Sequence, residues 1–210
     1  MNLRFALLAT LSAGPRTGYD LTQRFDSTVG HIWHAPHSQI YPELRRMEHA
    51  GLVAADEIPR GPRGTKREYR LTEDGLGELR RQASDVVPLQ RERDPVRLWA
   101  AYLEFAEPEA IVAQLEAHIA HYEEWLAIWT GMLGALVRRD DPQLAARLAG
   151  LPPASHDAVV ASKVFAYEGL VARAHMEIAW AQRGIELARS GTFTPDGERR
   201  HPLPSHAAER

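Results

Sequence analysis

A short stretch near residue 40 carries side chains that can read the edges of DNA bases. Glutamine can make a bidentate contact with adenine, serine can bond to several bases, and tyrosine can reach a phosphate or a thymine methyl. Arg45 follows Tyr41 by four residues, so both lie on one face of a helix. The candidate DNA-contacting residues here are Ser38, Gln39, Tyr41 and Arg45. The alternative assignments are Ser38 as a helix cap and Arg45 as a solvated charge.

A basic segment follows this stretch. Residues 60–70 contain five basic side chains and one acidic one, Glu68. Lysine and arginine contacts to phosphates position a protein on DNA and make its affinity depend on salt. The candidate phosphate contacts are Arg60, Arg63, Lys66 and Arg67. A solvated charge run is the alternative interpretation.

Hydrophobic spacing and turn residues predict the elements that position these side chains. Helices are expected at about 3–11, 17–28 and 36–50, strands at 52–58 and 67–71 with a loop between them rich in glycine and proline, and a further helix from Thr72 to Ser84. This order is typical of a winged helix-turn-helix. Pro42 lies in the first turn of the third helix or kinks it. The expected core of this domain includes Tyr19, Phe25, Trp33, Ile40, Leu44, Met47 and Tyr69.

The remainder of the chain is predicted to be helical. Asp94-Pro95 and Glu107-Pro108 are helix-start signals. Apolar residues then repeat in alternating steps of four and three along two long helices, the first with its seam from Leu115 to Leu136 and the second at about 156–190, with breaks at 140–142 and 151–153. Such seams favour packing along a partner helix. The sequence therefore predicts a mainly α chain with a small β-hairpin, in which a winged helix-turn-helix precedes a long-helix dimerisation domain.

Composition limits the class of protein. The net charge is −3, but residues 1–93 carry 14 basic and 12 acidic side chains, so the excess of acid lies in the second half. Without cysteine, the chain has no thiolate metal site or disulfide. No apolar run reaches the roughly 20 residues of a membrane span, and helix 3–11 explains the apolar N-terminus better than a signal peptide. We expect a cytoplasmic protein with domains at 1–88 and 94–190 and a disordered tail at 191–210.

Catalytic and metal sites have little support. No Ser-His-Asp order, phosphate-binding loop or carboxylate pair stands out, so we expect no enzyme activity. His31, His34 and His37 are spaced by three, and His118 and His121 precede Glu124 on one helix. Either group could bind a metal, but surface histidines are common, and no metal or cofactor is expected.

Tryptophans are enriched in the second half. Trp125 and Trp129 are one turn apart, and Trp99 and Trp180 flank them in the sequence. Aromatic residues at helical spacing are mostly core or dimer seam. The alternative is a pocket for a small hydrophobic or aromatic effector, for which the candidates are Trp99, Trp125 and Trp129.

Residues 38–53, Ser-Gln-Ile-Tyr-Pro-Glu-Leu-Arg-Arg-Met-Glu-His-Ala-Gly-Leu-Val, resemble the recognition helix and first wing strand of PadR family transcriptional regulators. Gly18-Tyr19-Asp20-Leu21 and residues 66–75 resemble the second helix and the second wing strand with its following helix. The helical half, from Asp94 through Trp180, is similar to the subfamily with a long C-terminal helical domain. The resemblance covers about residues 3–190.

The resemblance implies a homodimer that binds a near-palindromic double-stranded DNA operator. It further implies a repressor that a small effector releases. The competing hypothesis is a protein-interaction module that uses the winged helix and the long helices without DNA. The basic wing beside Gln39 and Tyr41 favours DNA, because a protein-binding winged helix does not require that charge.

Overall fold

The computed structural model describes residues 3–26, 30, 32, 36–59, 64–87 and 93–193. The chain is mainly helical with one small antiparallel sheet, which confirms the expected fold class. It forms two compact units, one of residues 1–89 with 135–163 and the other of residues 90–134 with 164–210. Each unit is discontinuous, so neither coincides with the linear ranges 1–88 and 94–190. Those ranges stay a prediction for independently folding domains.

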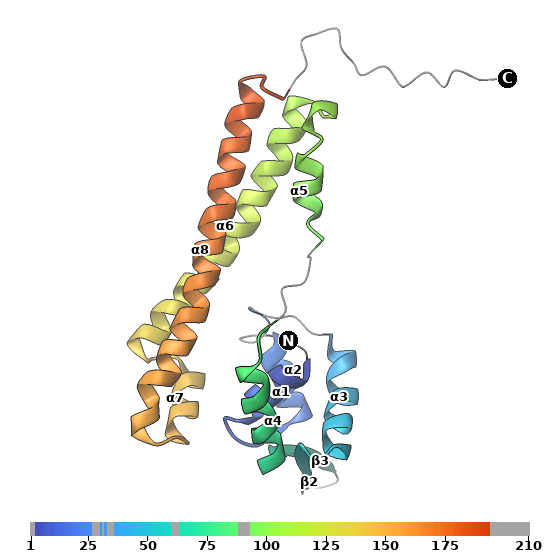
Figure 1. Cartoon of the computed structure of the whole chain (residues 1–210), viewed down its shortest axis with the longest axis vertical. Coiled ribbons are helices and arrows are strands. Elements are labelled where there is room, and N and C mark those ends of the chain that lie inside the picture. The colour runs from blue at the N-terminus through green and yellow to red at the C-terminus, as the bar shows by residue number, and fades with distance from the viewer. Residues whose placement is uncertain are drawn as a thin grey trace, which may run out of the picture. The chain divides into compact units, whose positions relative to one another are not determined.

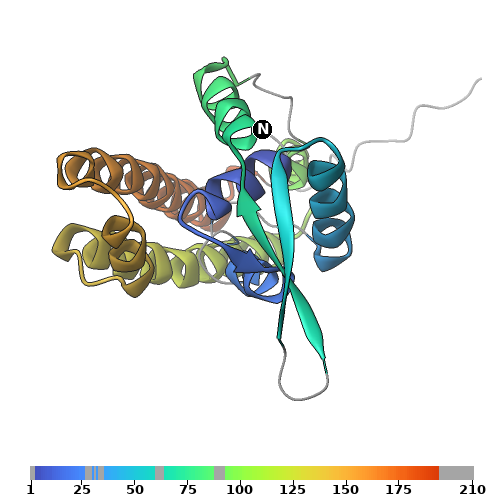
Figure 2. The same ribbon diagram turned by 90° about the horizontal axis from the view of Figure 1, so that it is seen from below.

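The first unit contains the winged helix-turn-helix. Its elements are α1 (Leu3–Leu11), β1 (Arg16–Thr17), α2 (Gly18–Asp26), α3 (His37–His49), β2 (Val53–Pro59), β3 (Thr65–Leu71) and α4 (Glu73–Ser84). The strands are ordered β1-β3-β2, and β2 and β3 form the expected hairpin (Figure 2), paired from Val53 opposite Leu71 to Pro59 opposite Thr65. The sequence did not predict β1, because a two-residue strand has no periodicity.

A single apolar cluster holds these elements together. Ile40, Leu44 and Met47 are completely buried on one side of α3, as their spacing predicts. Each such side chain contributes roughly 1.5–3 kcal/mol to folding. Phe25 and Tyr69 are also buried, whereas Tyr19 is 63% exposed, so its assignment to the core was wrong. Trp33 lies outside the described residues.

Tyr19 is exposed because of its position on α2. The buried face of this helix is formed by Leu21, Thr22 and Phe25, and Tyr19 lies outside this face. There the amide of Gln23, one turn later, donates a 2.9 Å hydrogen bond to the Tyr19 hydroxyl. Sequence spacing alone predicts that a large aromatic residue next to a buried face belongs to the core. In α2, the position of Tyr19 around the helix axis directs its ring outward instead.

The end of α3 and the start of α4 meet closely. Gly51, with φ of 71°, ends α3, and the amide of Leu52 donates to the carbonyl of Met47 in the usual glycine-terminated pattern. Thr72 caps α4 as predicted, because its hydroxyl accepts from the amide of Gly75 at 3.0 Å. A Cβ at Gly75 would fall 2.0 Å from the carbonyl oxygen of Leu52. Glycine is therefore required at this position.

The long helices are α6 (Pro108–Arg138) and α8 (His156–Arg189), which run side by side (Figure 1). Their predicted seams are buried or half-buried, including Leu115, Tyr167 and Ala181. The short elements are α5 (Pro95–Ala100), η2 (Leu103–Phe105), α7 (Pro142–Ala149) and η3 (Pro153–Ser155). The sequence predicts only a break at 140–142 and not α7, although Asp141-Pro142 repeats the cap-and-proline pattern of Asp94-Pro95.

The end of the chain is described only as far as Phe193, which packs against the cluster around Leu115 and Ile185. The rest of the predicted disordered tail lies outside the described residues. Within the described ranges, none of the helices combines the length and apolarity needed to cross a membrane.

Candidate nucleic-acid interface

Helix α3 separates the predicted DNA-contacting residues from the core. Its apolar side chains face inward, and Ser38, Gln39, Tyr41 and Arg45 are all exposed. The helix begins at His37, so Ser38 lies within it and is not its N-cap; Pro36 occupies that position without a side-chain hydrogen bond. Pro42 therefore falls in the second turn. Since proline has no N–H, the carbonyl of Ser38 lacks its helical donor.

A buried carboxylate fixes α3 against α1. Glu43 is 7% exposed, and its Oε1 accepts from Nε of Arg4 at 2.9 Å. Its Oε2 pairs with Nη2 of Arg46 at 2.8 Å. Removal of either arginine would leave this buried carboxylate with one partly exposed partner, which would destabilise the domain. Sequence reasoning did not single out Glu43, although its position between the buried Ile40, Leu44 and Met47 could have shown that it faces inward.

Side chains from α2, α3 and β3 share one hollow of about 610 Å³. The recognition-helix residues Tyr41 and Arg45 line it together with Tyr19 from α2 and with Lys66 and Arg67 from β3. The structure thus brings four of the eight predicted DNA-contacting residues together around one concave surface. It adds Tyr19, which the sequence had assigned to the core. Ser38 and Gln39 are exposed on the same helix but are not part of this lining.

The start of α2 is built around Thr17 and Asp20. Oδ2 of Asp20 accepts from the Thr17 hydroxyl at 2.7 Å and from the Thr17 amide at 3.1 Å, and the Thr17 hydroxyl accepts from the Asp20 amide at 3.2 Å. This reciprocal capping satisfies the first amides of the helix. The hydrogen bonds from Thr17 hold the pKa of Asp20 below its usual value, and the charge of Lys66 acts in the same direction.

Two of the four predicted phosphate contacts, Lys66 and Arg67, lie among the described residues, and their surroundings differ. Lys66 is exposed. Arg67 is also exposed, but its Nη2 lies 2.5 Å from Oε1 of Glu48, and its guanidinium lies 5.6 Å from the centre of the Tyr69 ring. Arg67 must exchange this ion pair for any phosphate contact. Arg60 and Arg63 lie outside the described residues.

The tryptophans predicted to bind an effector lie in the second unit. The rings of Trp125 and Trp129 are stacked on α6, with centroids 5.3 Å apart. Trp99 is half-buried against the separate cluster around Leu115 and Ala181. The structure therefore pairs two of the three tryptophans and shows Trp99 in a helix-packing contact.

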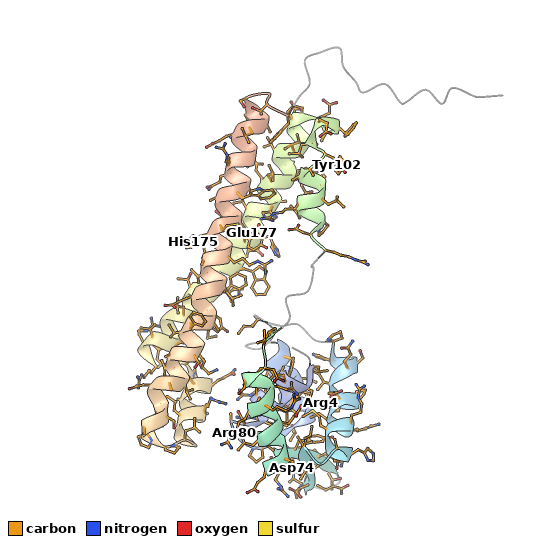
Figure 3. All side chains as sticks on the ribbon, in the orientation of Figure 1. Arg4, Asp74, Arg80, Tyr102, His175 and Glu177 are labelled. Atoms are coloured by element: carbon orange, nitrogen blue, oxygen red, sulfur yellow. The ribbon has the colours of Figure 1, made fainter. Side chains whose placement is uncertain are left out.

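A buried carboxylate also organises this unit. Glu177 lies on α8 (labelled in Figure 3), and its Oε2 is 2.6 Å from Nη2 of Arg97 on α5 and 3.0 Å from Nε2 of His118 on α6. The Arg97 guanidinium also lies 4.1 Å from the centre of the Trp180 ring. These contacts attach α5 to the helix pair. His118 therefore takes part in helix packing through its contact with Glu177. The sequence had instead suggested His118, His121 and Glu124 as a candidate metal-binding group.

No group of three potential metal ligands is found among the described residues. His31 and His34 of the other histidine group lie outside them, and the remaining member, His37, is exposed at the start of α3.

The fold and this surface define the described residues between 3 and 87 as a winged helix-turn-helix domain. Residues 7–81 match the model of the transcriptional regulator PadR-like family, so the chain carries a PadR-like domain. It is 39% identical to the negative transcriptional regulator PadR of Bacillus subtilis over 77 residues. The aligned segment covers 37% of this chain and 42% of that protein. Over 81 residues it is 38% identical to the probable transcriptional regulator Rv1176c of Mycobacterium tuberculosis, 39% of this chain and 43% of the relative. These matches span about two-fifths of the relatives' length.

Solved structures extend the likeness to the helical half at the level of the fold. The crystal structure of Bacillus subtilis PadR in complex with operator DNA has a TM-score of 0.71 at 22% identity, over 89% of this chain and 98% of that one. The same protein in complex with p-coumaric acid has a TM-score of 0.58 at 23% identity, over 86% and 98% of the two chains.

Proposed function

We propose that this protein is a sequence-specific DNA-binding transcriptional regulator. The observation that carries the proposal is the shared hollow, in which Tyr41 and Arg45 of α3 face Lys66 and Arg67 of β3. A recognition helix beside a basic wing matches what major-groove reading with flanking phosphate contacts requires. The PadR-like domain and the likeness to a regulator solved with operator DNA support the same function.

The residues divide between base and phosphate contacts. Ser38 and Gln39 lie in the first turn of α3, from which side chains reach base edges. Tyr41 and Arg45, one turn apart, contact phosphates or bases deeper along the helix. The phosphate contacts of the wing come from Lys66 and Arg67 together with Arg60 and Arg63. Tyr19 joins this set, because its exposed ring borders the same hollow.

The proposed assembly is a homodimer on a near-palindromic operator. Large apolar side chains remain exposed on the long helices, among them Phe165 at 78%, Met176 at 52% and Ile128 at 43%. A second copy that covers these side chains would remove them from water. Dimers with two recognition helices match operators with two half-sites.

The proposed mode of action is repression in the cytoplasm, relieved by a small effector. The name of the Bacillus subtilis relative, a negative regulator, supports repression, and its complex with p-coumaric acid supports a small ligand. The effector-binding candidates remain the stacked pair Trp125 and Trp129, of which Trp125 is the more exposed, and Trp99, which packs in a separate cluster. An effector acts by binding one dimer conformation more tightly than the other.

The test is a gel shift with the DNA upstream of the protein's own gene, at two salt concentrations, with random DNA as competitor. We expect selective binding that weakens steeply as salt rises. Selective binding that Gln39→Ala reduces more on the operator than on random DNA would support direct base reading. A folded dimer that shows no binding at low salt would overturn the proposal in favour of a protein-interaction module.

A further inference from the structure

A second hollow, of about 330 Å³, borders the recognition helix α3. Its lining consists of Leu3 and Arg4 from α1 and Gln39, Glu43 and Arg46 from α3, and we call it the Arg4 hollow. Gln39 and Tyr41 are two residues apart, so they point to nearly opposite sides of the helix axis. Tyr41 and Arg45 border the hollow beside the wing. The exposed residues Ser38 and Pro42 lie between these two sides of the helix.

Both sides of a recognition helix face DNA backbone when the helix lies in the major groove. The groove is about 12 Å wide, and a helix with its side chains is about 10–12 Å across, so the helix fills the space between two strands of phosphates. The proposed function assigns Lys66 and Arg67 to one of these strands and assigns no residue to the other. Arg4 and Arg46 are the basic residues of the Arg4 hollow, which lies on that other side.

The Arg4 hollow carries a net positive charge. Two guanidinium groups share one carboxylate, because Nε of Arg4 and Nη2 of Arg46 lie 2.9 and 2.8 Å from the two oxygens of Glu43. Glu78 on α4 is engaged elsewhere, since both of its oxygens accept from Arg81. These hydrogen bonds are the main reason that the pKa of Glu78 falls to about 2, and the charge of Arg4 adds to the effect. The two arginines and Glu43 therefore sum to one positive charge.

The carboxylate of this cluster lies deeper than the guanidinium groups. The side chain of Glu43 is 9% exposed, whereas those of Arg46 and Arg4 are 65% and 34% exposed. An anion that approaches from solvent meets guanidinium N–H groups before it meets Glu43. A guanidinium has five N–H donors in a planar fork, so an arginine that contacts a carboxylate through one nitrogen retains donors for a phosphate. Since Glu43 already orders both side chains, less side-chain entropy is lost on binding.

We propose that Arg4 and Arg46, positioned by Glu43, bind a phosphate of the DNA strand that lies across the major groove from the wing. Each half of the DNA site is then contacted on both sides of the groove, with Ser38 and Gln39 at the base edges between them. Glu43 acts here as a positioning residue and does not touch the DNA. This inference rests on the proposed function and extends it to α1.

The first test is the salt dependence of DNA affinity, measured by fluorescence anisotropy on the DNA upstream of the protein's own gene and on random DNA. Arg46→Gln should lower the slope of log affinity against log salt by about 0.9 per protomer on both DNAs. Arg173→Gln makes the same change in net charge at an exposed residue of α8 outside the Arg4 hollow, and should leave the slope unchanged. An unchanged slope for Arg46→Gln, or an equal loss for Arg173→Gln, would overturn the proposal. Circular dichroism checks that each variant is folded, and Arg4→Gln is the second variant should Arg46→Gln not fold.

The second test identifies the DNA strand by ethylation interference on the same upstream DNA. Ethylation neutralises one phosphate at a time, so it weakens the complex only where that phosphate is contacted. We expect one phosphate whose ethylation weakens binding by the wild type but not by Arg46→Gln, and another that distinguishes Lys66→Gln in the same way. The two phosphates should lie on opposite strands across one major groove. Two phosphates on a single strand, or an identical pattern for Arg46→Gln and the wild type, would contradict the assignment.

The two tests separate this inference from the proposed function. A folded protein that binds no DNA at low salt would overturn the proposed function and the phosphate contact together. Selective DNA binding with an unchanged salt slope and an unchanged ethylation pattern in Arg46→Gln and Arg4→Gln would overturn only the phosphate contact and leave the function standing.

Discussion

The ring of Tyr41 lies directly against the backbone of Gly18. A Cβ placed on Gly18 would fall 2.5 Å from Cε1 of Tyr41, so no larger residue fits without displacing the ring. The first residue of α2 therefore determines where the central aromatic side chain of the recognition helix lies. Gly18 and Tyr41 both border the hollow that Lys66 also lines.

Gly18→Ala should weaken DNA binding while leaving the fold intact. The obstructing atom belongs to an exposed side chain that can rotate away, so the free energy of unfolding should change by less than about 1 kcal/mol. Loss of the Tyr41 contact, at about 1–2 kcal/mol, corresponds to a roughly fivefold to thirtyfold weaker complex. The measurement is a DNA titration by fluorescence anisotropy. In a Tyr41→Ala background, Gly18→Ala should have no further effect, and an undiminished second loss would contradict this explanation.

Lys66→Gln should reduce the salt dependence of DNA binding. If Lys66 contacts a phosphate, its removal lowers the slope of log affinity against log salt by about 0.9 per protomer, equally on operator and random DNA. Arg80→Gln on α4 removes the same charge from an exposed residue outside the hollow and is the matched control. Identical slopes for Lys66→Gln and the wild type would show that Lys66 contacts no phosphate and is only solvated.

The sequence predicted the elements of this domain well because each has a strong local cause. The spacing of Ile40, Leu44 and Met47, the glycine at 51 and the cap at Thr72 determine where α3 and α4 begin, end and face. The second wing strand alternates polar and apolar residues from Arg67 to Leu71, as half-buried strands do. The PadR resemblance rested on the same segments, and the match over residues 7–81 confirms it.

Features that depend on contacts between distant segments could not be predicted. The Arg4–Glu43 pair joins residues 39 positions apart, and the Glu177 contacts join α8 to α5 and α6. The outward direction of Tyr19 depends on where α2 begins, a boundary that local spacing leaves uncertain by a residue or two. The pocket of about 390 Å³ that Ala9, Arg147 and Lys163 line needs the packing of α7, a helix that the sequence did not predict.

Gly75→Ala should destabilise the fold strongly. The added methyl group would meet the backbone carbonyl of Leu52 at 2.0 Å, and this carbonyl is fixed because it accepts from the amide of Thr72 at 3.2 Å. Overpacking of this kind costs about 1–3 kcal/mol or more. Gly77→Ala, one half-turn later in α4, meets nothing within 4 Å and should stabilise the protein by about 0.5–1 kcal/mol. Urea denaturation followed by circular dichroism measures both, and effects of equal sign would contradict the prediction.

Lys163 should make the protein more stable as the pH rises. Burial, with the charges of Arg147 and Arg24, lowers the pKa of Lys163 in the folded state below the ordinary value of 10.5. Between the folded pKa and 10.5, the unfolded chain binds more protons than the folded one, so the free energy of unfolding increases with pH in that window and levels off above it. Lys163→Met removes this contribution, and its stability should exceed that of the wild type most at the lower pH values. The measurement compares urea unfolding of the two proteins from about pH 7 to about pH 10, across the approach to the ordinary lysine pKa. All other groups titrate equally in both proteins. A difference in the free energy of unfolding that stays constant across this range would therefore show that the charge of Lys163 does not destabilise the fold.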